Sequence, residues 1–240
     1  MPIETEFVNI AVADGTTMRG YLAKPEGTPR AAMIVYQEIF GVNSHIRDVA
    51  GRFAKEGYLA LAPEIFHRTA PGFESGYSEA DMGPAFGQMQ AMTAEGQEAD
   101  VKAAFAWLES NANGLKIAAI GYCMGGRLAT LTAIAAPLAC AISYYGGGIA
   151  PNQFGPGILG RLKDLHGPAM FLWAGKDHFI PAEAVQAINA ELRAAGKSFV
   201  STEFADADHG FFCDQRSSYH ASTAAVAWPM TLAYLADKTK

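Results

Sequence analysis

The sequence has few charged residues, few cysteines and no cluster of lysines and arginines. Charged residues make up 18% of the 240 residues, and the net charge is −6. An acidic chain without a basic patch argues against nucleic acid as a partner. Cysteine occurs only at Cys123, Cys140 and Cys213, without a CxxC pair. This sparse, odd set indicates a reducing compartment, so we expect a cytoplasmic protein without disulfides.

The sequence also lacks a recognisable targeting or membrane segment. Its first residues, "MPIETEFVNI", have neither the basic nor the apolar region of a secretory signal. An uncharged segment from Leu128 to Gly160 contains an apolar run almost long enough to span a bilayer. Pro137 interrupts this run, and three glycines follow it. We therefore predict a buried helix, a turn and a buried strand rather than a membrane span.

Apolar strand-like runs alternate with segments of helical periodicity. A hairpin is predicted at 6–11 and 17–23, and further strands at 31–37, 59–65, 116–122, 140–146, 169–175 and 199–206. Helices are predicted at 44–58 (ending at Gly57), 94–110, 125–136, 182–196 and about 217–237, and a loop at 66–82. The pattern predicts an α/β fold: one domain over 1–240, with a mostly parallel sheet, helices on both faces and an N-terminal antiparallel hairpin.

Four side chains that could act as a nucleophile, an acid or a base directly follow predicted strands. They are Glu38, Cys123, Asp177 and His209. In open α/β sheets, ligands bind outside the carboxyl ends of the strands, so these groups are expected to meet at one edge. The chain order of nucleophile, acid and histidine is that of the α/β-hydrolase catalytic triad.

The stretch "GYCMGG" has the spacing of a nucleophile elbow, with cysteine in the usual place of serine. Gly121 and Gly125 are expected where larger side chains would clash in a tight strand-to-helix turn. The helix N-terminus would favour the thiolate of Cys123. The backbone N–H groups of Met124 and Ile39 are the candidates for an oxyanion hole.

Other residues compete for the same roles. Asp206 and Asp208 are alternatives to Asp177, although Asp208 adjoins His209 and is awkwardly placed to hydrogen-bond its ring. None of the other histidines stands directly after the last predicted strand, as His209 does. Cys140 and Cys213 are expected to be structural thiols.

Four stretches together resemble the dienelactone hydrolase family (carboxymethylenebutenolidases) of the α/β-hydrolase fold. They are "QEIFGVN" (37–43), "GYCMGG" (121–126), "GKDHFIP" (175–181) and "DHGFF" (208–212). The resemblance implies a Cys123–His209–Asp177 triad that hydrolyses a small ester or lactone through a thioester. It also implies that Glu38 accepts the thiol proton when substrate binds, and that no metal or organic cofactor takes part. A monomer or small homo-oligomer is expected.

The substrate pocket departs from the family pattern. Dienelactone hydrolases hold the substrate carboxylate with two arginines; Arg216 is a plausible counterpart of one, whereas residues 72–104 contain no arginine. The physiological substrate is therefore expected to differ from dienelactone. Tyr144 and Tyr145, at another strand end, are candidates for the pocket wall, with packing as the equal alternative.

Three other functions compete with this prediction. A class I glutaminase also uses a cysteine elbow, but it needs a His-x-Glu pair, which the sequence lacks. A broad carboxylesterase or phosphotriesterase would differ only in its pocket. A hydrolase-like binding protein would lack a triad residue, and none is missing.

Overall fold

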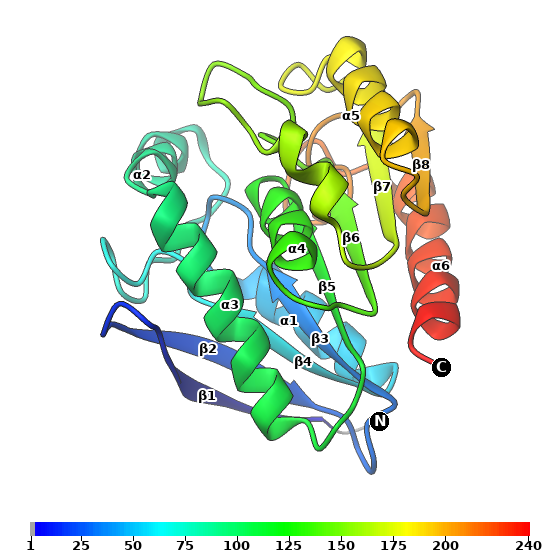
Figure 1. Cartoon of the computed structure of the whole chain (residues 1–240). Coiled ribbons are helices and arrows are strands. Elements are labelled where there is room, and N and C mark those ends of the chain that lie inside the picture. The colour runs from blue at the N-terminus through cyan, green and yellow to red at the C-terminus, as the bar shows by residue number, and fades with distance from the viewer. Residues whose placement is uncertain (1–2) are drawn as a thin grey trace.

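A computed structural model describes residues 3–240. Eight strands form one sheet in the order β1-β2-β4-β3-β5-β6-β7-β8 (Figure 1). The strands are β1 Glu4–Ala11, β2 Thr17–Lys24, β3 Ala31–Tyr36, β4 Tyr58–Pro63, β5 Ile117–Tyr122, β6 Cys140–Tyr144, β7 Ala169–Ala174 and β8 Phe199–Phe204. The α-helices are α1 Ser44–Lys55, α2 Glu79–Gln90, α3 Ala94–Asn111, α4 Met124–Ala135, α5 Ala182–Ala194 and α6 Ala221–Lys238, with a short 3₁₀ helix at Leu159–Asp164.

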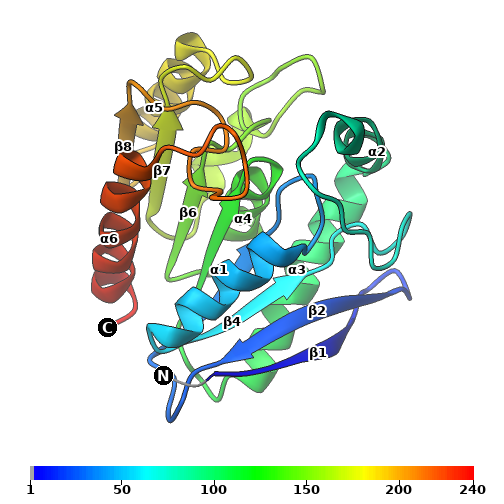
Figure 2. The ribbon, with the colours of Figure 1, turned by 180° about the vertical axis from the view of Figure 1, so that it is seen from behind.

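The sheet is mostly parallel, as the sequence predicts. β1 and β2 form an antiparallel hairpin that joins the sheet through β2 and β4, and β3 to β8 run parallel. Helices α1 and α6 cover one face, and α3, α4 and α5 cover the other (Figures 1 and 2). Every residue of β3, β4, β5, β6 and β7 is buried, which explains their continuous apolar runs. The carboxyl ends of these strands therefore meet at one edge.

The uncharged segment folds as a helix, a turn and a strand. It contains most of α4, the turn at Pro137 and the buried strand β6. Within residues 3–240, no helix combines the length and the apolarity that crossing a membrane would require.

Two boundaries differ from the prediction. The region predicted as a loop at 66–82 ends inside α2, which begins at Glu79. Gly83, Pro84 and Gly87 weaken the helical signal of α2, but the Asp81 carboxylate caps its start by accepting from the Ser78 N–H at 2.9 Å. The last helix begins at residue 221 rather than near 217, because consecutive turns occupy the chain between His209 and α6.

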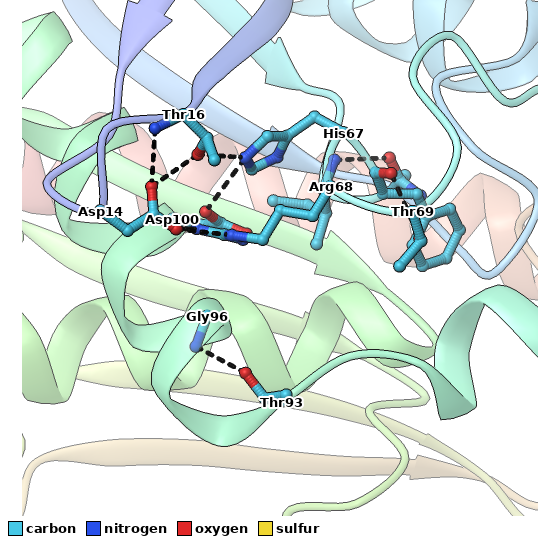
Figure 3. A network of polar contacts seen from close by, with 11 residues as sticks. Asp14, Thr16, His67, Arg68, Thr69, Thr93, Gly96 and Asp100 are labelled. Carbon is cyan, nitrogen blue, oxygen red and sulfur yellow. Dashed lines mark hydrogen bonds and ion pairs between the residues drawn. The ribbon is translucent and has the colours of Figure 1, made fainter.

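A polar network fixes the hairpin turn and the loop after β4 to α3 (Figure 3). Arg68 donates to Asp14 Oδ2 at 2.7 Å and to the buried Asp100 of α3 at 2.8 Å. His67 Nε2 lies 3.0 Å from the hydroxyl of Thr16. The network holds α3 against the sheet edge at which the strand-end side chains gather.

Candidate active site

Cys123 occupies a strained turn between β5 and α4. Its φ of +56° lies in a region that non-glycine residues rarely adopt. A Cβ at Gly121 would lie 1.9 Å from the carbonyl oxygen of Gly125, and a Cβ at Gly125 would lie 2.5 Å from that of Gln37. Only glycine fits both positions, for the steric reason expected from the sequence. The turn presents Cys123 at the wall of a cavity.

His209 and Asp177 form a buried pair beside this turn. The His209 Nδ1 atom lies 2.7 Å from Asp177 Oδ2, and the other carboxylate oxygen accepts from the Phe179 N–H at 2.8 Å. Asp208 instead accepts from the backbone N–H of His209 at 2.6 Å, and the side chain of Asp206 is 86% exposed. Asp177 is therefore the aspartate that orients the His209 ring.

The charge state of His209 depends on its neighbours. Burial would lower the pKa of His209, but the adjacent Cys123 sulfur and the hydrogen bond that His209 donates to Asp177 raise that pKa to about 10. The His209 ring is therefore protonated at neutral pH and lies next to the sulfur of Cys123.

The two proposed oxyanion donors lie at the same cavity. Ile39 and Met124 both line it together with Cys123. In residues 3–240, neither backbone N–H donates to another protein group, so both remain able to bind a ligand oxygen. The loop that carries Ile39 is held by Gln37, whose side chain bridges the carbonyl of Glu38 and the N–H of Ile65, at 3.2 Å each.

Glu38 and Arg216 form an ion pair next to the nucleophile. The fully buried Glu38 accepts from Arg216 Nη1 at 2.9 Å, and its second oxygen has no partner among the described residues. Burial opposes the charge of Arg216, but Glu38, together with Cys123 and Tyr145, raises the pKa of Arg216. Arg216 lines the cavity rather than lying free on the surface.

The predicted pocket-wall role of Tyr144 and Tyr145 is not what the structure shows. Both are completely buried, and neither lines the cavity. The Tyr144 hydroxyl lies 2.7 Å from Thr231 Oγ1 of α6, which covers the face of the sheet opposite to α4. The Tyr145 ring instead packs against the His209 ring, with the two ring centroids 5.1 Å apart.

The cavity has a volume of about 590 Å³. Met82, Phe86 and Met89 of α2 line one side, and the ring of Phe154 stacks on Phe86 at 5.8 Å between centroids. These residues could not be identified from the sequence, because no helix is predicted at 79–90 and the predicted loop at 66–82 overlaps its start. They make most of the pocket apolar and suit it to a small organic substrate.

The three thiols are expected to differ sharply in reactivity. Burial raises the pKa of Cys140 and of Cys213 to about 12, whereas Cys123 is partly exposed beside an imidazolium. Iodoacetamide at pH 7 should therefore alkylate one thiol per chain, and peptide mass spectrometry should locate the label at Cys123. Equal labelling of Cys140 or Cys213 in the folded protein would contradict this assignment. Unfolding in urea should make all three accessible and serves as the control.

Within residues 3–240, no cluster of three or more His, Cys, Asp and Glu side chains is arranged to hold a metal ion.

Comparisons with known proteins identify the family to which the chain is similar. The model of the dienelactone hydrolase family matches residues 18–238. The carboxymethylenebutenolidase of Pseudomonas putida is 33% identical over 235 residues, covering 97% of this chain and 96% of that protein. A crystal structure from Klebsiella pneumoniae, provisionally assigned as a dienelactone hydrolase, superposes with a TM-score of 0.86 at 31% identity, covering 98% and 99% of the two chains. A dienelactone hydrolase-like promiscuous phosphotriesterase, P91 from metagenomic libraries, has a TM-score of 0.80 at 22% identity, with the same coverage.

Proposed function

The chain belongs to the dienelactone hydrolase family and is a hydrolase of ester or lactone bonds, and we propose that it acts through a thioester on Cys123. The observation that carries the proposal is the 2.7 Å contact of His209 with Asp177 at the cavity into which Cys123 opens. A cysteine nucleophile, an oriented imidazolium and two free N–H donors are the parts required for acyl transfer.

The proposed reaction has two steps. The Cys123 sulfur attacks the carbonyl carbon, and the N–H groups of Ile39 and Met124 stabilise the oxyanion. His209 gives its proton to the leaving oxygen, and an acyl thioester remains on Cys123. In the second step His209 takes a proton from water, and the resulting hydroxide attacks the thioester, which releases the acid and restores the thiolate. In a lactone the leaving hydroxyl stays attached to the acid.

Glu38 and Arg216 are proposed to couple nucleophile activation to substrate binding. A substrate carboxylate near the nucleophile would compete with Glu38 for Arg216, because both anions fit the same guanidinium. The carboxylate of Glu38 would then be free to accept the thiol proton of Cys123. Support for this role comes from the 2.9 Å ion pair, from the partnerless oxygen of Glu38 and from the place of Arg216 in the cavity wall.

A broad carboxylesterase or phosphotriesterase activity is the alternative. The cavity is largely apolar, and the similar fold of P91 is compatible with phosphotriester substrates. A screen of lactones, enol esters, aryl esters and aryl phosphotriesters, compared by kcat/KM, separates the two. Higher kcat/KM for phosphotriesters than for every lactone and ester would favour the alternative.

Rapid mixing with p-nitrophenyl acetate tests the thioester directly. We expect a burst of one nitrophenol per active site and an acetyl group on Cys123 in the intact-protein mass spectrum of the quenched sample. Glu38→Gln should slow the burst phase, because the neutral amide cannot take up the thiol proton. An unchanged burst rate in a stably folded Glu38→Gln protein would refute the coupling role. An acyl group found on another residue would refute the thioester.

A further inference from the structure

Arg127 is a cation in the cavity wall that has no carboxylate partner in the described part of the chain. It follows the nucleophile by four residues on α4, is partly buried and lines the same cavity as Cys123. Among the described residues, its guanidinium has one hydrogen-bond acceptor, the amide oxygen of Gln97. Within residues 3–240, no carboxylate lies within ion-pair distance of it. A cation that is partly removed from water is normally paired with an anion, so we expect this guanidinium to bind an anionic ligand.

The surroundings hold the guanidinium in place. Gln97, on α3, is itself buried. A Cβ on Gly148 would lie 3.2 Å from Arg127 Cδ, so the glycine leaves room for the arginine stem at the cavity wall. The start of α3 is fixed in turn by Thr93, whose hydroxyl accepts from the Gly96 N–H at 3.0 Å (Figure 3).

Glu98, which follows Gln97 in the sequence, is already paired with two other cations. Glu98 accepts from Arg161 at 3.0 Å and from Lys102 at 2.9 Å. Arg127 is therefore left with positive charge, although the whole chain carries a net charge of −6. Burial lowers the pKa of Arg127, which agrees with a guanidinium that lacks a compensating anion.

We propose that Arg127 binds a carboxylate carried by the substrate at a distance from the scissile ester bond. This inference rests on the proposed hydrolase function and specifies its substrate class: an ester or lactone with a remote anionic group. The site differs from Arg216, whose guanidinium Glu38 already neutralises. The free N–H groups of Arg127 and the buried amide of Gln97 provide donors for such a carboxylate.

The distance along α4 between Cys123 and Arg127 sets how far the bound carboxylate would lie from the scissile ester. Four residues correspond to about 6 Å along a helix axis, at roughly 1.5 Å per residue. A carboxylate next to the ester carbonyl would therefore lie near Arg216 and Glu38. One at the end of a short apolar chain would reach Arg127 along the apolar side of the cavity. Chain length thus distinguishes the two arginines.

A series of p-nitrophenyl esters of ω-carboxy acids of increasing chain length tests the proposal, with the ω-methyl esters as neutral counterparts. The wild type should prefer the anionic member at one intermediate length. Arg127→Gln should lower kcat/KM for that member by roughly 10- to 150-fold, the usual range for a charge-assisted hydrogen bond. It should leave the neutral series unchanged. Equal losses on both series, or no loss on either, would overturn the proposal.

Two further variants sharpen the result. Arg161→Gln changes another arginine of the cavity wall, but one that pairs with Glu98, so the preference for the anionic ester should remain. Arg127→Lys should recover part of the preference, since it keeps the charge without the planar donor pair. A preference abolished by Arg161→Gln and kept in Arg127→Gln would place the anion at Arg161 and refute our assignment.

Calorimetry separates this inference from the proposed chemistry. The free dicarboxylate of the preferred length is titrated into Cys123→Ala and into the double variant with Arg127→Gln. Binding should weaken by the same roughly 10- to 150-fold in the double variant. That loss in a protein without thioester chemistry would support the anion site even if Cys123 were not the nucleophile. Equal binding by both proteins would overturn the anion site and leave the hydrolase function untouched.

Discussion

Cys123→Ala is expected to lower kcat/KM for the best ester substrate by about 10⁴- to 10⁶-fold, the range seen when a covalent nucleophile is removed. The variant keeps the oxyanion donors and the apolar cavity, and these alone account for the residual rate. Substrate should still bind, so the loss should appear mainly in kcat. Steady-state kinetics with protein expressed in a host free of competing esterases measures this.

The alanine variant should fold normally. The elbow excludes side chains at Gly121 and Gly125, not at position 123, and alanine removes only the sulfur that faces the cavity. An unchanged thermal unfolding midpoint is the control. Activity within tenfold of the wild type in a folded, pure Cys123→Ala protein would eliminate the thioester mechanism.

Cys123→Ser provides a matched comparison at the same position. The hydroxyl is nearly the size of the thiol, but a hydroxyl is not ionised by a neighbouring imidazolium at neutral pH. His209 would have to act as a base, although Asp177 still favours its protonated form. We therefore expect weak activity in Cys123→Ser, and rates equal to the wild type would show that the mechanism does not require a thiolate.

Most of the fold could be predicted from local patterns. The strands at 31–37, 59–65 and 169–175 are continuous apolar runs between breakers, and β3, β4 and β7 form there within one or two residues. The helix α2 could not be recognised, since its glycines and its proline obscure the period that marks a helix. Its stability depends on contacts with the cavity and on its capped start, which are tertiary features.

The candidate site was predictable where it depends on strand ends. The positions of Cys123, Asp177 and His209 after parallel strands are enough to bring them to one edge. The pairing of Arg216 with Glu38 was not predictable, because it depends on the consecutive turns between His209 and α6. The choice between pocket wall and packing for Tyr144 could not be made from the sequence, because a strand end does not reveal which face a side chain points to.

The role of Arg127 had a visible signal in the sequence. It stands directly after "GYCMGG" and at the start of the uncharged segment, where a charged residue has no obvious function. What the sequence could not show is that the helix turns this side chain toward the cavity and that no carboxylate among residues 3–240 pairs with it. Both facts depend on how α3 packs against α4.

Asp177→Asn is expected to lower kcat by about 10³- to 10⁴-fold, the typical cost when the acid that orients a catalytic histidine becomes an amide. The 2.7 Å contact with His209 Nδ1 fixes the ring with Nε2 toward the sulfur. An amide can turn its NH₂ group toward Nδ1, which stabilises the wrong tautomer and no longer supports the imidazolium charge. Asp206→Asn, at a side chain that is 86% exposed, is the matched control and should retain full activity.

The pH profile of Asp177→Asn distinguishes a catalytic effect from a structural one. In the wild type, Cys123 and Asp177 raise the pKa of His209 to about 10, against the effect of burial. Removing the Asp177 carboxylate takes away one of these causes, so the pKa of His209 should fall. His209 then loses its proton at lower pH, and without that proton it cannot supply the leaving oxygen. The alkaline limb of kcat should therefore move to lower pH in Asp177→Asn. A reduced kcat with an unmoved alkaline limb would mean that Asp177 only holds the ring in place and does not set the charge of His209.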